Sequence, residues 1–329
     1  MSNIGPLKFN PILKPVLWGG SRIASFKGAK PFDKPIGETW EISGLEGFES
    51  IVLSNDSLNG LTIRELLDQY GYQIMGQRLT EIYGNHFPLL IKFIDAAQDL
   101  SIQVHPNDAI AYNRHKCSGK TELWYIIDSK NDATIYSGFK TQTNREELKK
   151  HINNGTLTDL LAHFTPHRGD TFYLPAGRIH SIGAGNLLLE IQQTSDITYR
   201  VFDYNRTDLN GKKRELHTDL AIEAIDYQVY NEYCHHYDSQ YNNEIEINRC
   251  EYFVTTLFKT NNNYRINIAD KDSFRIIIIT AGNGILSDSN NNTINLNQGD
   301  VILIPATTKW VDIKTPNGDD IEIVTTYVP

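Results

Sequence analysis

One short pattern occurs twice in the chain, and this repeat limits the possible folds more than any other feature of the sequence. The segment GDTFYLPA spans residues 169–176, and GDVILIPA spans residues 299–306. Each copy begins with a Gly-Asp turn, continues as a short strand and ends at a Pro-Ala corner. Two copies so far apart predict two related β-domains in one chain.

The remainder of the sequence agrees with a mainly β protein. Runs of β-branched and aromatic residues are separated by Gly, Asn, Asp or Pro about every 8–12 residues, which is typical of sandwiches and barrels. Apolar spacing and capping residues predict helical segments at residues 62–75, 106–115, 144–164 and 216–225. Thr62 is the expected N-cap of the first segment, and Asn154-Gly155 divides the third into two short helices.

An Asn-rich stretch, residues 239–248, follows the last of these helices and is the predicted linker. Residues 1–238 then form the first domain, which carries the helical insertions and is the expected catalytic domain. Residues 249–329 form the second β-domain.

Charge and composition exclude several classes of function. The net charge of −9 makes a broad nucleic-acid-binding face improbable, so an anionic substrate needs a local cluster of Lys and Arg. No apolar run approaches the length of about 18 residues that crosses a membrane. The three cysteines lack CxxC spacing, which argues against a disulfide framework or a thiolate metal site. With no signal-peptide pattern at the N-terminus, we expect a cytoplasmic protein.

The first copy of the repeat belongs to a longer motif. It reads Gly169, five residues, Pro175-x-Gly177, two residues and His180. This motif resembles the second motif of cupin β-barrels, in which the Pro-x-Gly corner points the His into the barrel, although Ala184 replaces an asparagine often found there. The resemblance implies two cupin-like jelly-roll β-barrels, with a few helices inserted in the N-terminal part.

The second copy of the repeat lacks the second glycine and the histidine of this motif, and the histidine is the residue that could bind a metal inside the barrel. Thr307 stands at the position of Gly177, and Trp310 at the position of His180. We therefore expect a C-terminal barrel without a metal site, in which Trp310 fills the volume that the histidine takes in the first barrel.

Further ligands are expected from neighbouring strands, where residues two apart share a face. Gln103 and His105 have this spacing, as do Lys120 and Glu122. The residues that alternate with them are Ile102, Val104, Thr121 and Leu123. Together with His180 they offer two imidazoles and one carboxylate, a donor set that suits catalytic Zn²⁺. Gln103 is the unusual member, because amide oxygens are weak zinc ligands.

Four segments in this order are similar to the type I mannose-6-phosphate isomerases, in the short bacterial form. They are LIKFIDAAQDLSIQVHPND at 90–108, GKTELWY at 119–125, PAGRIHSIG at 175–183, and the stretch from Glu190 to Arg200. The resemblance implies one Zn²⁺ per chain, held by Gln103, His105, Glu122 and His180. It also implies a substrate pocket with Lys92, Ser101, Lys120 and Glu190, and a catalytic arginine, Arg200.

The implied activity is the interconversion of mannose 6-phosphate and fructose 6-phosphate through an enediolate. Zinc would supply an electrophile for the growing negative charge, and Arg200 would stabilise charge or hold the phosphate. Glu190 and a zinc-bound water are both candidates for the base. The expected partner is a small sugar phosphate, with no nucleic acid or membrane, and the chain is expected to be a monomer or weak dimer.

Structural roles compete with these assignments. The two histidines could be buried core residues, Gln103 a hydrogen-bond donor behind the metal, and Lys120 a surface charge. Arg200 could pair with Asp196 or Asp203, and Glu190 with a barrel arginine. At the level of function, the alternatives are a cupin oxidoreductase that uses iron and oxygen, and a sugar- or metal-binding cupin without catalysis.

Overall fold

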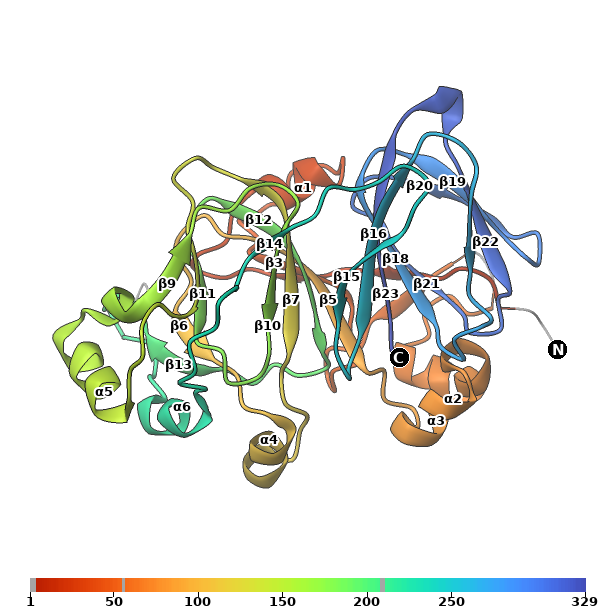
Figure 1. The fold of residues 1–329 in the computed structure, drawn as a ribbon. Helices are drawn as coiled ribbons and strands as arrows, with labels where there is room; N and C mark the ends of the chain where they lie inside the picture. The colour runs from red at the N-terminus through yellow and green to blue at the C-terminus, as the bar shows by residue number, and fades with distance from the viewer. Residues whose placement is uncertain (1–3, 55–56, 208–210) are drawn as a thin grey trace.

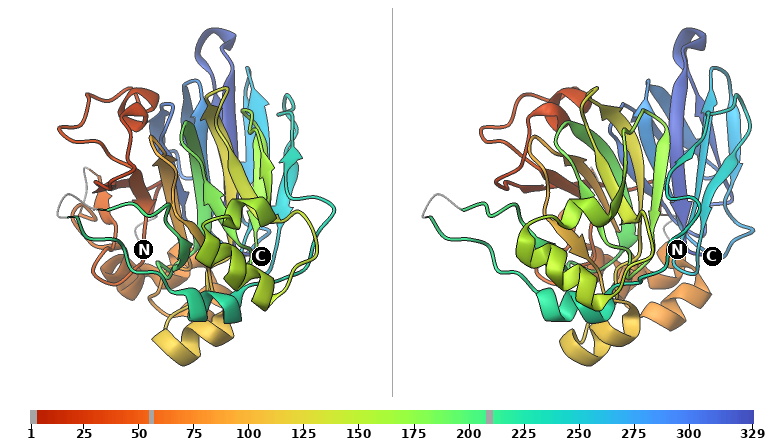
Figure 2. Two further views of the ribbon diagram at one scale, coloured as in Figure 1. Left: turned by 90° about the vertical axis from the view of Figure 1, so that its left-hand side faces the viewer. Right: turned by 60° about the vertical axis from the view of Figure 1, so that its left-hand side comes forward.

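The computed structural model of the chain describes residues 4–54, 57–207 and 211–329. Within these residues, four main β-sheets are stacked in layers, and a two-stranded ribbon of β1 (Lys8–Asn10) and β4 (Ile51–Leu53) lies beside them (Figures 1 and 2). Each half of the chain contributes two sheets that face each other. The predicted mainly β class is confirmed, and each half is a sandwich of open sheets.

The N-terminal half pairs a seven-stranded sheet with a five-stranded one. The larger sheet has the order β14 (His235–His236), β10 (Asp170–Leu174), β7 (Glu122–Ser129), β12 (Asn186–Gln193), β5 (Leu89–Asp95), β3 (Glu38–Ile42), β2 (Ile12–Lys14). The smaller sheet has the order β13 (Tyr199–Phe202), β6 (Ile102–Val104), β11 (His180–Ile182), β8 (Ile135–Phe139), β9 (Leu161–Phe164).

The C-terminal half repeats this arrangement with fewer strands. Its first sheet has the order β15 (Ile245–Arg249), β16 (Val254–Thr260), β23 (Ile321–Tyr327), β18 (Arg275–Ala281), β21 (Val301–Ile304). Its second has the order β17 (Tyr264–Asn267), β22 (Trp310–Lys314), β19 (Gly284–Asp288), β20 (Thr293–Leu296).

The two copies of the sequence repeat occupy equivalent places in the two halves. Gly169 precedes β10 and Gly299 precedes β21, both with φ in the left-handed region, at 90° and 82°. The next strand begins at His180 in the first copy and at Trp310 in the second. The repeat thus marks a duplicated pair of strands.

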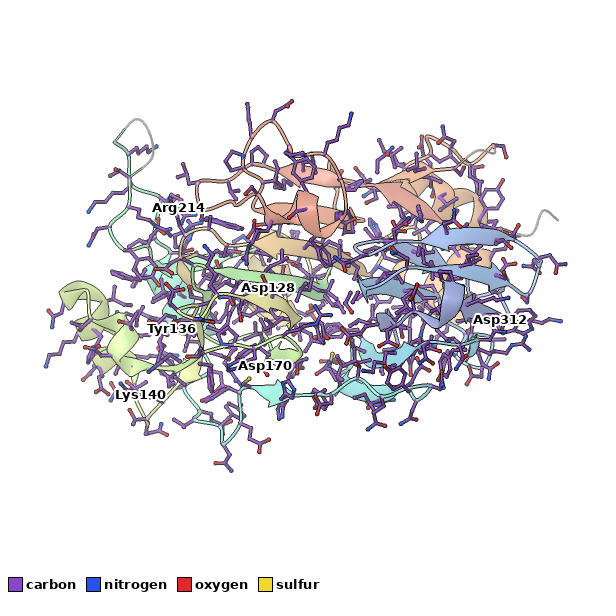
Figure 3. The ribbon with its side chains drawn as sticks, turned by 90° about the horizontal axis from the view of Figure 1, so that it is seen from above. Asp128, Tyr136, Lys140, Asp170, Arg214 and Asp312 are labelled. Carbon is purple, nitrogen blue, oxygen red and sulfur yellow. The ribbon has the colours of Figure 1, made fainter. Side chains whose placement is uncertain are left out.

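The expectation that Trp310 fills the interior of the second sandwich is wrong. Val311 and Ile313 of β22 point into the core, so the alternation of the strand places Trp310 and Asp312 on the outer face. On this outer face the Arg265 guanidinium lies 3.8 Å from the centre of the Trp310 ring. The neighbouring Asp312 is labelled in Figure 3.

Helices line the lower edge of the sheets in Figure 1, apart from α1 at the upper edge. Their bounds are α1 Arg22–Phe26, α2 Ile63–Met75, α3 Gln77–Tyr83, α4 Asp108–His115, α5 Arg145–Asn154 and α6 Thr218–Ala224, with 3₁₀ turns at Leu157–Leu160 and Pro316–Gly318. Thr62 caps α2 as predicted, through a capping box with Glu65. The helix predicted after Gly155 is wrong, because a 3₁₀ turn and then β9 follow that glycine.

The boundary proposed at residues 239–248 stays a prediction. In this stretch Gln240 and Asn243 form an isolated bridge, and β15 starts at Ile245 and pairs with β16 of the C-terminal half. All three cysteines are free thiols. Among the described residues, no helix has the length and apolar character needed to cross a lipid bilayer.

The two central sheets share one apolar core. Alternate residues of β5, including Leu89, Ile91 and Phe93, pack in the same cluster as Ile276 and Ile278 of β18. The seven-stranded sheet is therefore covered on both faces, by the smaller N-terminal sheet on one side and by the C-terminal half on the other.

This shared core predicts a large effect of truncating Ile276. Ile276→Ala should lower the free energy of unfolding by about 2–5 kcal/mol, because it leaves a cavity between the sheets. Ile285→Ala is the control, since Ile285 is 38% exposed, and should change it by less than about 0.5 kcal/mol. Urea unfolding followed by fluorescence and circular dichroism would measure both. Separate transitions for the two halves would contradict a shared core.

Candidate active site

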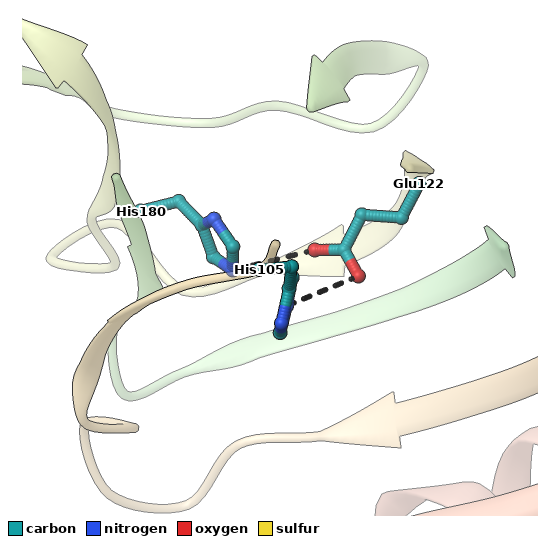
Figure 4. Close-up of side chains that lie close together, drawn as sticks. All are labelled: His105, Glu122 and His180. Carbon is teal, nitrogen blue, oxygen red and sulfur yellow. Dashed lines mark ion pairs between the residues drawn. The ribbon is translucent and has the colours of Figure 1, made fainter. Parts of the chain in front are cut away.

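Three buried side chains converge between the two sheets of the N-terminal half. His105 directly follows β6, Glu122 begins β7 and His180 begins β11 (Figure 4). Glu122 Oε2 lies 3.6 Å from His105 Nε2, and Glu122 Oε1 lies 3.4 Å from His180 Nε2. One ligand atom from each residue fits within 4.8 Å of the others, which is the separation expected around a single ion.

The Pro-x-Gly corner places His180 and ties it to His105. Gly177 has φ of 92°, a conformation that favours glycine. A Cβ at this position would lie only 3.1 Å from the carbonyl oxygen of Ala224. The Gly177 N–H donates to the carbonyl of His105 at 2.8 Å, so the corner and the strand of the other histidine are held together.

Hydrogen bonds to backbone carbonyls fix the tautomers of both histidines. His105 Nδ1 lies 2.8 Å from the Ile197 carbonyl, and His180 Nδ1 lies 2.8 Å from the Arg178 carbonyl. Because a carbonyl only accepts, each Nδ1 carries the proton and each Nε2 presents its lone pair toward Glu122. Metal-binding histidines are commonly oriented in this way.

The electrostatics of the three side chains favour a cation between them. Burial holds the pKa of His105 well below its ordinary value and lowers the pKa of His180 to about 4. Burial and the charge of Glu190 raise the pKa of Glu122 to about 8. His105 Nε2 and both Glu122 oxygens are buried without a hydrogen-bond partner, although Lys120 Nζ lies 3.0 Å from Glu122 Oε2. Nitrogen and carboxylate donors in this state fit a divalent metal such as zinc.

Gln103 lies at the edge of this group. On β6 it is the strand partner of both His180 and Arg200, and its amide nitrogen lies 3.3 Å from His180 Nε2. A half turn of the Gln103 amide about its Cγ–Cδ bond exchanges nitrogen and oxygen, so the amide oxygen can lie beside His180 Nε2 instead. Gln103 can therefore act as a fourth ligand or as a donor behind the metal.

A pocket of about 280 Å³ lies beside the candidate metal group, because its lining residues Gln103 and Lys120 contact His180 and Glu122. Its lining includes the remaining residues predicted from the sequence, namely Lys92, Ser101, Gln103, Lys120, Glu190 and Arg200. Thr198 also lines it, as expected for a residue on the same face of the strand as Arg200.

Ion pairs between side chains of alternating charge connect the pocket-lining residues Glu38, Lys92, Glu190 and Lys120 to Glu122 of the candidate metal group. Lys92 Nζ lies 3.5 Å from Glu38 Oε2 and 3.1 Å from Glu190 Oε1. Lys120 Nζ lies 3.8 Å from Glu190 Oε1 and 3.0 Å from Glu122 Oε2. Both lysines are almost fully buried, so the interpretation of Lys120 as a surface charge is wrong.

Glu190 holds the two lysines in place. Burial alone would raise the pKa of Glu190, but the Lys120 and Lys92 ammonium groups lower it to about 2. Its second oxygen accepts a hydrogen bond from Trp124 Nε1 at 2.8 Å. Burial opposes the charge of Lys92, but Glu190 and Glu38 together raise the pKa of Lys92 above its ordinary value. A carboxylate bound in this way is a weak base.

Arg200 lies on β13 and lines the pocket, and not all of its guanidinium N–H groups are used in hydrogen bonds. Its Nη1 donates to the Glu215 carbonyl at 2.9 Å, and its Nε is buried without a partner. Burial, followed by the positive charge of Arg214, lowers the pKa of Arg200. The ion pairs of Asp203 go to Arg206 and Arg214, so the alternative pairing of Arg200 with Asp203 is not observed in the described residues.

Comparison with known proteins identifies the family. The family profile described as phosphomannose isomerase type I, catalytic domain, matches residues 7–128. The mannose-6-phosphate isomerase ManA of Bacillus subtilis is 38% identical over 304 residues, which cover 91% of this chain and 93% of that protein. The chain belongs to the type I phosphomannose isomerases.

A second relative and a solved structure are also similar to this chain in sequence and in fold. The mannose-6-phosphate isomerase of Streptococcus mutans is 37% identical over 224 residues, 67% of each chain. The crystal structure of the mannose 6-phosphate isomerase from Bacillus subtilis matches with a TM-score of 0.84 and 32% identity, covering 98% of this chain and 99% of that chain. As a phosphomannose isomerase, the chain is an enzyme, as its motifs predict.

Sequence reasoning assigned no site role to three charged residues of the phosphomannose isomerase pocket, and it considered one of them, Asp196, only as a structural partner of Arg200. Glu38 lies in the segment GETWEIS, which resembles the family but contributed no site residue to the prediction. Arg214 ends a Lys-Lys-Arg run outside the four motifs, and this run was its only signal. Trp18 was expected in the core, and it is 5% exposed there while also lining the pocket.

Proposed function

We propose that this enzyme is a zinc-dependent aldose–ketose isomerase that interconverts mannose 6-phosphate and fructose 6-phosphate through an enediolate. The observation that carries the proposal is a pocket lined by the cationic side chains of Lys92, Lys120 and Arg200. Two of its lining residues, Lys120 and Gln103, contact Glu122 and His180 of the buried candidate metal group, which His105 completes. Metal donors suit a sugar carbonyl, and the cations suit a phosphate.

The isomerisation moves a proton between C1 and C2 of the sugar, so negative charge grows on oxygen. Zinc bound by His105, Glu122 and His180, with Gln103 beside them, would supply the electrophile for this charge. Lys120 Nζ, held between Glu122 and Glu190, is placed to donate to a sugar oxygen beside that group. Arg200 adds unused donors to the same pocket.

Glu190 is assigned a supporting role in this proposal. Its low pKa and its bonds to Lys92 and Trp124 disfavour proton abstraction. Holding the two lysines charged and in place is the role that fits its surroundings. Of the two bases considered from the sequence, Glu190 is therefore the weaker candidate.

A coupled assay with metal replacement tests the proposal. The purified enzyme should convert mannose 6-phosphate to fructose 6-phosphate, lose at least about 100-fold in rate after chelation, and recover when Zn²⁺ is restored. The reason is that the charge growing on oxygen loses its electrophile. Turnover that persists after metal analysis shows an empty site would contradict the role of zinc. Oxygen uptake without isomerisation would instead favour an oxidoreductase.

A further inference from the structure

Arg214 reaches the pocket from a segment that folds back after β13. Tyr204 and Asn205 both have positive φ, at 54° and 57°, and turn the chain sharply. An isolated bridge between Thr207 and Lys213 then brings the chain back toward the pocket. Arg214, labelled in Figure 3, lines the same pocket as Arg200.

A buried carboxylate fixes the orientation of Arg214. Asp203 is 5% exposed and accepts from Arg214 Nε at 2.8 Å and also from Arg214 Nη2. This pairing through two adjacent nitrogens defines the plane of the guanidinium. Nη1 is not used in the contact with Asp203.

Asp203 is shared by two arginines. Arg206 Nη2 also donates to Asp203, so one carboxylate serves two guanidinium groups. Arg200 is close enough that the charges of both arginines act on it, together with those of Asp203 and Glu215. The charged side chains that line the whole pocket are four cations against three anions, so one positive charge is unbalanced; they are Lys92, Lys120, Arg200 and Arg214 against Glu38, Glu190 and Asp196. The candidate metal group lies beyond Gln103, the strand partner of Arg200.

We propose that Arg214, oriented by Asp203, binds the phosphate of the substrate and makes the enzyme prefer a phosphorylated hexose to a free one. The inference rests on the proposed function, because that function supplies the phosphate. A dianion offsets the unbalanced charge, and an oriented guanidinium offers it a directed donor. Asp203 acts as a positioning residue and does not touch the substrate.

The kinetic test compares two arginines that share the same carboxylate. Arg214→Gln should raise KM for mannose 6-phosphate about 10- to 100-fold while kcat falls less than about threefold, since the bond is made in both ground and transition states. Arg206→Gln is the control: it also removes one positive charge and one ion pair of Asp203, but Arg206 is not among the pocket-lining residues. It should change KM less than about threefold. Equal effects of the two variants would overturn the proposal.

A binding test separates this inference from the proposed function. Inorganic phosphate titrated into the zinc-loaded enzyme by calorimetry should bind the wild type about 10-fold or more tightly than Arg214→Gln, and Arg214→Lys should recover only part of the loss. This measurement requires no turnover, so it remains decisive if mannose 6-phosphate is not a substrate. Phosphate affinity that is unchanged in Arg214→Gln would refute the role of Arg214.

Discussion

Replacing Glu122 by glutamine is expected to remove the bound metal and to lower kcat/KM for mannose 6-phosphate by about 10³-fold or more. The two oxygens of Glu122 face His105 Nε2 and His180 Nε2, so the carboxylate lies at the centre of the group. Glutamine keeps the shape but lacks the negative charge that offsets a divalent cation. Metal analysis of the purified variant and the coupled assay would measure the two effects.

The stability of the same variant distinguishes a metal ligand from a structural carboxylate. Without metal, both oxygens of Glu122 are buried and lack hydrogen bonds, and burial raises the pKa of this carboxyl to about 8, so its negative charge contributes little to the stability of the metal-free protein. Glu122→Gln should therefore be at least as stable as the chelated wild type, and zinc should stabilise only the wild type.

Glu41→Gln is the matched control for Glu122→Gln. Glu41 is a buried carboxylate outside the site, 2.7 Å from Lys27 Nζ. This variant should lose stability and keep its metal, because its charge is used in an ion pair. A Glu122→Gln enzyme that retains zinc and turnover would contradict the assignment.

Arg200→Ala is expected to lower kcat by about 10²–10³-fold, the usual cost of removing one donor that stabilises developing charge. The guanidinium has a buried Nε without a partner inside the pocket, which leaves a donor available to an anionic oxygen. Zinc content should not change, since Arg200 is not a ligand. Arg200→Lys should recover little, because an ammonium group cannot reproduce the planar pair of donors.

Steady-state kinetics, metal analysis and thermal melting would test the prediction for Arg200. Arg265→Ala is the control, because Arg265 is an exposed arginine of the C-terminal half that pairs with Asp312. It should leave kcat unchanged. If Arg200→Ala turns over at nearly the normal rate, or loses its zinc, then Arg200 has a structural role.

The parts of the fold that depend on local sequence were predictable. Helix α2 carries its own capping box at Thr62 and Glu65, and α5 ends at the left-handed Gly155 as its sequence indicates. Helix α3 was missed because its first N–H groups are capped by Asp272, which is far away in the sequence. A segment that depends on such a distant partner gives no local signal.

The same distinction applies to the site. Gln103, His105, Glu122 and His180 alternate with mostly apolar residues or follow a Pro-x-Gly corner, and these signals led to a group that the fold brings together. The role of Arg214 depends on Asp203 and on a turn with positive φ at two non-glycine residues. No pattern in the sequence around Arg214 predicts its contact with Asp203, so the structure was needed to find it.

The strand β5 serves two purposes on its two faces. Lys92 points toward the pocket, while Ile91 and Phe93 beside it pack against the C-terminal half. Cut from that half, the seven-stranded sheet would present a wide apolar surface to water and would need a second subunit to cover it. The duplicated half occupies the place of such a subunit. That covering role depends on apolar packing, so it requires no metal ligand in the C-terminal half.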